Sequence, residues 1–133
     1  MKLERKNKPY PLSATSRKKL EGVHPDLVAL VAEMLHYFDI SVIEGLRSVE
    51  TQKRYVAEGR SQTMTSKHLT GDAIDIYPYP VPKKGKEINS SSVEWDKMAL
   101  VAYYCAGKLG IENLEWGGTW KSLVDKPHFQ INR

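Results

Sequence analysis

A ten-residue segment, SKHLTGDAID at residues 66–75, constrains the fold of this 133-residue chain more than any other feature. It places His68 and Asp75 seven residues apart around Gly71 and leads into an apolar, aromatic run. This spacing suits two ligands of one metal ion, one in a loop and one on the strand that follows. A capped loop followed by a hydrogen-bonded Asp would have the same spacing, so the segment alone leaves both interpretations open.

A second polar cluster, DKPHFQ at residues 125–130, places Asp125 three residues before His128. Catalytic zinc sites typically take three protein ligands from His, Asp or Glu and leave the fourth position to water. His68, Asp75 and His128 would form such a set. Asp125 would remain as an acid able to accept a proton from the bound water. Together the two clusters favour a zinc hydrolase.

The first segment resembles the S-x-H-x-x-G-x-A-x-D signature of a zinc peptidase family. This family includes D-alanyl-D-alanine carboxypeptidases and dipeptidases, and the L-alanyl-D-glutamate endopeptidases of phages and bacteria. Five positions match the signature: Ser66, His68, Gly71, Ala73 and Asp75. The segment GLRSVETQKRYVAEGRS at residues 45–61 is similar to the arginine-containing segment of the family, and LEWGGTW followed by DKPHFQ is similar to its C-terminal metal segment.

The resemblance implies a role for each matching polar residue. The zinc ligands would be His68, Asp75 and His128, and Asp125 would be the catalytic base. Arg47, at the junction between a predicted strand and helix, would reach the substrate near the zinc, and Ser66 would assist it in substrate binding. A guanidinium suits an oxyanion or a substrate carboxylate through its paired donors. The alternative for Arg47 is a surface salt bridge.

One departure from the family helps to select a branch. Many D-alanyl-D-alanine enzymes resemble ExxH at the last segment, whereas this chain has Asp125 in DxxH. The shorter acid with the PHF sequence looks more like the L-alanyl-D-glutamate endopeptidases, and this resemblance implies cleavage of peptidoglycan stem peptides. A D-alanyl-D-alanine carboxypeptidase with the same ligands is one alternative. The other is a non-catalytic wall-binding module with a structural zinc, although such sites are generally closed by four protein ligands.

Composition indicates a single globular domain spanning residues 1–133. The chain is 41% hydrophobic and 27% charged, which is ordinary for such a domain. Cys105 is the lone cysteine, so neither an internal disulfide nor a cysteine-based zinc cluster can form. Because it lies on the apolar stripe of a predicted helix, we expect a buried structural thiol.

The basic character of the chain is concentrated in an N-terminal arm, about residues 1–19, which carries seven Lys or Arg and one Glu. We expect a solvated arm, with electrostatic contact to an anionic wall or outer-membrane surface as the functional alternative. No nucleic-acid motif accompanies these charges, so we expect no nucleic-acid partner. We also expect a monomer.

No secretion signal and no apolar stretch of membrane-spanning length can be recognised. A peptidoglycan enzyme without an export signal would wait in the host cytoplasm. It would reach the periplasmic cell wall only after holin-type release, as a phage endolysin of a Gram-negative host does.

The hydrophobic pattern predicts an α+β fold in which a small antiparallel sheet carries the zinc site and packs against helices. Trp116 and Trp120 are predicted to pack in the core rather than to line the base of a substrate cleft. A helix over residues 92–109 should be capped by Ser91 and Glu94 and bury a stripe that ends at Leu109. The other predicted elements are a short helix from Ser13 or Ser16 to Gly22, helices over 25–38 and 49–58 (the latter capped by Ser48), strands over 40–46, 73–79 and 111–116, a polar loop over 80–92, and a final strand holding His128.

Overall fold

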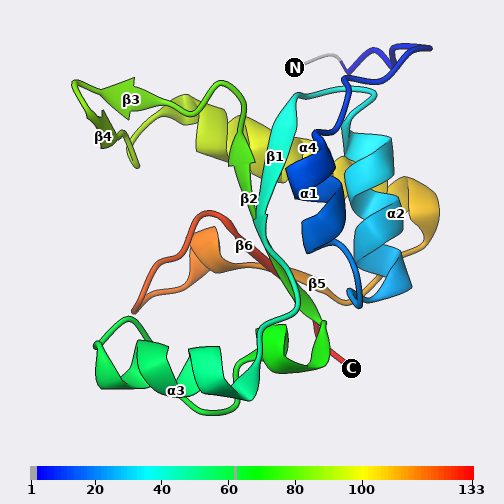
Figure 1. Ribbon diagram of the computed structural model, residues 1–133. Helices are drawn as coiled ribbons and strands as arrows, with labels where there is room; N and C mark the ends of the chain where they lie inside the picture. Colours follow the sequence, from blue (N-terminus) through cyan, green and yellow to red (C-terminus); the bar gives the residue numbers. More distant parts are fainter. Residues whose placement is uncertain (1–2, 62) are drawn as a thin grey trace.

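The structure is a computed structural model that describes residues 3–61 and 63–133. Figure 1 shows the arrangement of its helices and strands. In chain order the elements are α1 (Ala14–Lys19), α2 (Pro25–Met34), β1 (Ile40–Glu44), α3 (Val49–Ala57), the 3-10 helix η1 (Lys67–Thr70), β2 (Ala73–Pro78), β3 (Lys83–Lys84), β4 (Glu87–Ile88), α4 (Val93–Leu109), β5 (Leu114–Trp116), the 3-10 helix η2 (Gly117–Thr119) and β6 (His128–Ile131).

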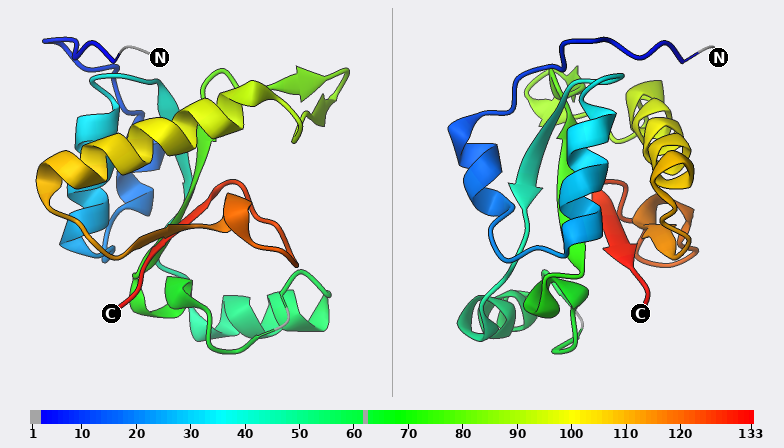
Figure 2. Two further views of the ribbon diagram at one scale, coloured as in Figure 1. Left: turned by 180° about the vertical axis from the view of Figure 1, so that it is seen from behind. Right: turned by 90° about the vertical axis from the view of Figure 1, so that its right-hand side faces the viewer.

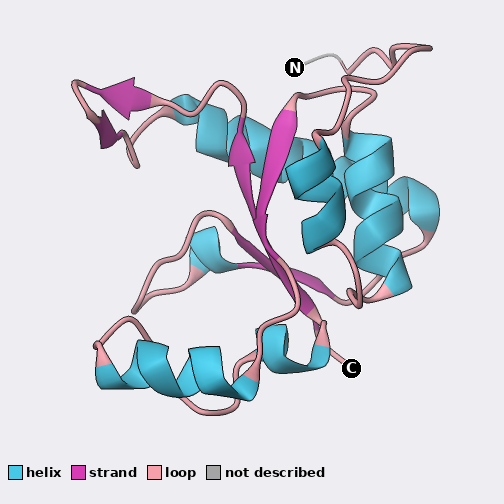
Figure 3. Cartoon of the chain, in the orientation of Figure 1, coloured by secondary structure: helices cyan, strands magenta, loops and turns pink. Residues whose placement is uncertain are grey.

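Four antiparallel strands in the order β1-β2-β6-β5 form the main sheet (Figure 3). The central strand β2 is rich in β-branched and aromatic residues, and its Ile74 and Ile76 are fully buried. The register places Asp75 of β2 opposite His128 of β6 on one side and opposite Glu44 of β1 on the other. The predicted α+β fold with a small antiparallel sheet is therefore confirmed.

The hydrophobic core lies where α2 and α4 pack together against the sheet (Figure 2). Leu30, Met34 and Met98 are fully buried on these helices, and Cys105 is buried with them as predicted. On the outer edge of the sheet, α1 covers β1. Its buried Ser16 hydroxyl accepts a hydrogen bond from the Val42 N–H at 3.0 Å, which satisfies part of the exposed strand edge.

The basic N-terminal segment is attached to the domain rather than free. The backbone N–H of Lys6 donates to His36 O at 2.8 Å, and Arg5 pairs with Glu33 of α2 at 2.9 Å. Hydrogen bonds from Arg5 and Lys108 outweigh the opposing effect of burial and lower the pKa of Glu33 to about 2. These contacts anchor residues 3–12 beside α2, while most of their side chains, Lys6 and Lys8 among them, stay exposed as expected for a solvated arm.

Local signals located most elements to within a few residues. Ser48 caps α3, because its side chain accepts from the N–H of Thr51, and Gly110 ends α4 in the left-handed conformation. The helix predicted over 25–38 ends earlier, with Leu35 as its C-cap. The strand predicted from residue 111 begins at Leu114.

Three details of the region around α4 were predicted wrongly. The cap of α4 is Ser92, whose hydroxyl accepts from the Glu94 N–H, and not Ser91. Leu109, at the end of the predicted core stripe, is 43% exposed. The polar loop contains a small hairpin of β3 and β4, which projects from the body in Figure 1.

None of the described helices combines the length and apolarity that crossing a membrane requires.

Candidate active site

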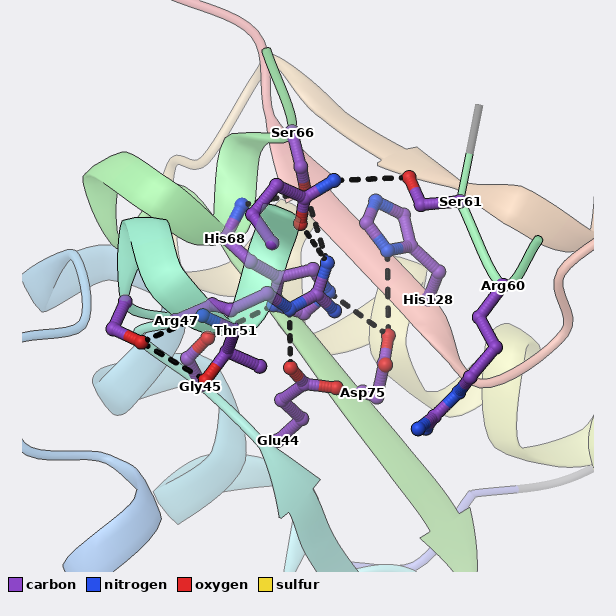
Figure 4. A network of polar contacts seen from close by, with 12 residues as sticks. Glu44, Gly45, Arg47, Thr51, Arg60, Ser61, Ser66, His68, Asp75 and His128 are labelled. Carbon is purple, nitrogen blue, oxygen red and sulfur yellow. Dashed lines mark hydrogen bonds and ion pairs between the residues drawn. The ribbon is translucent and has the colours of Figure 1, made fainter. Parts of the chain in front are cut away.

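Three buried or half-buried side chains converge beside the central strand (Figure 4). The Nε2 atom of His68 and the Nδ1 atom of His128 each lie 3.3 Å from Oδ1 of Asp75. One ligand atom from each residue lies within 4.8 Å of the others, so this group could hold a metal ion. The Oδ1 atom of Asp75 is buried and has no hydrogen-bond partner among the described residues. A cation at this point would satisfy it.

The fold explains why these residues meet. Asp75 and His128 are cross-strand neighbours on β2 and β6, so their side chains emerge together from one face of the sheet. The short helix η1 brings His68 to the same point, and Ser66 caps it by accepting from the His68 N–H at 3.3 Å. Gly71 then ends η1 with a φ of 78°, a conformation that lets the chain turn directly into β2.

Both imidazoles are oriented so that a free nitrogen lone pair faces Asp75. Nδ1 of His68 lies 2.9 Å from the carbonyl oxygen of Gly45, which can only accept, so this nitrogen carries the hydrogen. Nε2 of His128 lies 2.8 Å from Oε1 of Gln130. The amide nitrogen of Gln130 donates to Glu115 and to another acceptor, which leaves Oε1 to accept from His128. Outer hydrogen bonds of this kind normally accompany metal-binding histidines.

Two glycines allow close backbone approaches at the site. A Cβ atom at Gly45 would lie 2.0 Å from the carbonyl oxygen of Lys19, so a side chain there would displace the carbonyl that orients His68. A Cβ atom at Gly117 would lie 2.3 Å from the Asp125 carbonyl oxygen. The carbonyl oxygen of Gly117 also accepts from the Asp125 N–H at 3.0 Å, so this contact fixes the backbone of Asp125 beside β6.

The charges of the site depend on one another. Burial raises the pKa of Asp75, but the close approach of His128 and His68 outweighs it and holds the pKa well below its usual range. Burial lowers the pKa of His128, and the adjacent Asp75 carboxylate more than reverses this, so the net shift is upward. The site thus keeps the Asp75 carboxylate ionised, and a cation, which requires neutral imidazoles, would bind in competition with protonation of His128.

Asp125 lies next to this group without belonging to it. Its Oδ2 atom is 4.0 Å from Nδ1 of His128, and its side chain is 44% exposed. Burial and, secondarily, the negative charge of Asp75 raise the pKa of Asp125. A carboxylate with a raised pKa, beside a candidate metal centre and open to solvent, can accept and return a proton.

Arg47 lies in the same pocket, and its guanidinium is held from several sides. Nε donates to the carboxylate of Glu44, and Nη1 donates to Oε1 of Gln52 at 2.6 Å. Nη1 also lies 3.5 Å from the Ser66 hydroxyl, and the guanidinium lies 4.7 Å from the centre of the Tyr55 ring. The Arg47 side chain is only 9% exposed. Arg47 does form an ion pair, but it is inside the site and not on the surface.

These side chains surround an open pocket of about 770 Å³. One wall is formed by α3, η1 and the segment between them, and the other by residues after η2, including Trp120, Leu123 and Val124. Trp120 is half-buried, and its ring centre lies 5.1 Å from that of His128. The prediction that Trp120 packs in the core is therefore wrong, whereas Trp116 is 8% exposed and lies parallel to Phe129 in the core.

Three supporting residues were not identified from the sequence. Gln130 could have been identified, because it follows His128 by two residues on the same strand and strand alternation places both side chains on one face. Glu44 and Gln52 had no such local signal. Gln52 is fully buried on α3, and besides holding Arg47 it donates to the Ser61 hydroxyl at 2.9 Å and to the Thr63 carbonyl. These contacts exist only once α3 packs over the following loop.

Comparisons with known proteins agree with this site. Residues 9–131 match the family model described as phage L-alanyl-D-glutamate peptidase. The chain is 33% identical over 135 residues to the L-alanyl-D-glutamate peptidase of Escherichia phage T5, with 93% of this chain and 90% of that protein covered. It is 40% identical over 95 residues to the L-alanyl-D-glutamate peptidase of Listeria phage A118. That match covers 71% of this chain and spans about a third, 31%, of the Listeria phage protein.

The fold also matches a solved structure. The L-Ala-D-Glu endopeptidase ChiX of Serratia marcescens superposes with a TM-score of 0.78 at 38% identity, covering 94% of this chain and 92% of that one. The residues matched by the family model, 9–131, contain all residues of the candidate site. The chain belongs to the phage L-alanyl-D-glutamate peptidase family.

Proposed function

We propose that the protein is a zinc-dependent peptidase that hydrolyses the L-alanyl-D-glutamate bond of peptidoglycan stem peptides. The observation that carries this proposal is the convergence of His68, Asp75 and His128 on one point in an open pocket, with Asp125 beside them. The names of the relatives support the choice of bond, since both curated relatives and the structural neighbour carry this activity in their names.

The donor set supports zinc as the metal. His68, His128 and Asp75 offer two imidazole nitrogens and one carboxylate oxygen. Magnesium and calcium prefer all-oxygen ligands, whereas this combination with an open fourth position is typical of catalytic zinc. When bound, zinc would polarise the scissile carbonyl and lower the pKa of a water molecule toward neutrality.

The remaining chemistry falls to side chains of the pocket. Asp125 accepts the proton of the attacking water and delivers it to the leaving amine of D-glutamate, a transfer that its partial exposure and raised pKa both favour. Arg47 and Ser66 hold the substrate at the carbonyl oxygen, where negative charge develops. Glu44 and Gln52 fix the Arg47 guanidinium, so it needs little reorganisation when substrate binds.

In this proposal the protein is a phage endolysin. It is stored in the host cytoplasm as a single-domain monomer, reaches the periplasmic wall after holin-type release and takes part in lysis. The exposed lysines of the N-terminal segment add weak, salt-sensitive attraction to anionic wall or outer-membrane surfaces.

Lysis of permeabilised cells tests the proposal directly. Purified protein added to Gram-negative cells with a permeabilised outer membrane should lower their turbidity. Treatment with a chelator followed by dialysis should abolish this activity, and zinc added back should restore it. A protein that binds the walls but leaves turbidity unchanged, with or without zinc, would be a binding module and not a peptidase.

A further inference from the structure

Two cationic side chains on one wall of the pocket have no buried counter-ion among the described residues. Lys67, the first residue of η1, is half-buried and lines the pocket, and its ammonium forms no ion pair or hydrogen bond with any described group. Arg60 lines the same wall, with its guanidinium 3.9 Å from the centre of the Tyr55 ring. Its one ion pair in the described chain, with Glu58 at 3.5 Å, is exposed on both sides. Pairs of this kind contribute little.

The other charged groups of the pocket are already matched. Arg47 is neutralised by Glu44, which contacts its Nε atom. Asp75 lies between the two imidazoles of the candidate metal site, and Asp125 lies beside one of them. The described acids of the pocket therefore lie beside Arg47 or at the candidate metal site, and none of them pairs with Lys67. A ligand entering the pocket would meet Lys67 and Arg60 as uncompensated positive charge on this wall.

The substrate class of the proposed function has a group that suits this charge, and the inference rests on that function. In stem peptides, D-glutamate is joined to the next residue through its side-chain carboxyl group. Its main-chain carboxylate is therefore free, on the carbon that bears the leaving nitrogen. Asp125 and the candidate metal ligands determine where that nitrogen must lie. The carboxylate is then close to the metal site, and Lys67 directly precedes His68 in the chain.

We propose that Lys67, assisted by Arg60, forms a subsite for the free main-chain carboxylate of the D-glutamyl residue. Arg47 is assigned to the carbonyl oxygen in the proposed function, and its Nε and Nη1 atoms already bind Glu44 and Gln52, so the carboxylate needs a different cation. The subsite makes the enzyme selective for stem peptides whose D-glutamate carries a free carboxylate. Peptides in which this group is a carboxamide lose the charge-assisted hydrogen bond and are poor substrates.

Two synthetic stem peptides test the subsite, identical except that one carries the main-chain carboxylate of D-glutamate and the other a carboxamide. We expect wild-type kcat/KM to be at least about tenfold higher for the carboxylate peptide, the size of one charge-assisted hydrogen bond. In Lys67→Met the preference should fall toward unity, through loss on the carboxylate peptide alone. Lys67→Arg should keep most of the preference. Lys53→Met removes the same charge from an exposed position of α3 outside the pocket and should leave the preference unchanged.

A second variant, Arg60→Met, keeps the subsite testable if Lys67→Met does not fold. Arg60→Met changes an exposed side chain, and it should reduce the preference in the same direction but by less than Lys67→Met. Zinc content and circular dichroism of all variants should match wild type. A wild-type enzyme that cuts both peptides equally, or a Lys67→Met variant that keeps the full preference, overturns the subsite while the proposed function stands. If wild type cuts neither peptide, the proposed function fails and the subsite with it.

Discussion

Replacing Asp125 by Ala separates catalysis from metal binding and folding. The Asp125 side chain is 44% exposed, and its nearest described ionic neighbour, His128 Nδ1, is 4.0 Å away. Its two hydrogen bonds, with Gly117 O and with the His128 N–H, belong to the backbone and survive the substitution. We therefore expect a change in the free energy of unfolding within about 0.5 kcal/mol, as for other partly exposed positions. Bound zinc should stay near one equivalent.

Turnover should behave differently. Positioned acid–base groups contribute about 10²–10⁴ in rate, so Asp125→Ala should lose roughly 100-fold or more in kcat, or at least about 2.7 kcal/mol of transition-state stabilisation. Asp125→Glu should recover part of this loss, because the longer side chain keeps a carboxylate within reach of the water. Zinc analysis and lytic rates on the same preparations provide the test. Zinc depletion in Asp125→Ala would show that Asp125 supports the ligands, and a zinc-replete, fully active variant would refute the mechanism.

Three further predictions concern the metal, the arginine and the N-terminal segment. His68→Ala and His128→Ala should each abolish lysis and hold well below one equivalent of zinc by metal analysis, because two ligands cannot complete the site; full occupancy in both would contradict the assignment. Arg47→Lys keeps the charge but loses the planar fork, so activity should fall by roughly tenfold or more with zinc content unchanged, and wild-type rates would refute its role. Glu33→Gln should lower the free energy of unfolding at neutral pH. The folded-state pKa of Glu33 is lowered to about 2, so the difference in unfolding free energy between wild type and Glu33→Gln should shrink as the pH falls from about 4.5 toward 2. Denaturant unfolding at several pH values measures this difference, with Glu112→Gln as the exposed control.

The convergence of His68 and Asp75 could be predicted from local signals, whereas His128 was added from a distant cluster and from the family resemblance. His68 and Asp75 lie within ten residues of chain, and the hydrophobic alternation that follows identifies Asp75 as a strand residue. The position of Ser48 as the cap of α3 follows from a propensity that acts over one helical turn. Such features depend on few long-range contacts, so sequence patterns are sufficient to find them.

The parts that were missed depend on packing between distant segments. Gln52 looks like a solvent-facing helix residue until α3 folds over the loop after residue 60, where its amide finds buried partners. Trp120 is as apolar as Trp116, and only the path of the chain after η2 turns its ring toward His128. The attachment of the basic segment before α1 was not predicted because its contacts, the Arg5–Glu33 ion pair and backbone hydrogen bonds to Leu35 and His36, join residues far apart in the chain.

The identity of the cleaved bond tests the central claim most directly. Purified peptidoglycan should be digested with the zinc-loaded protein and the products separated and analysed by mass spectrometry. Cleavage between L-alanine and D-glutamate releases peptides with a new D-glutamyl amino terminus and leaves L-alanine on the glycan. Cleavage at this bond, absent from a parallel digest with His68→Ala, is the result we predict. Release of terminal D-alanine from otherwise intact stem peptides would identify a carboxypeptidase and contradict the account.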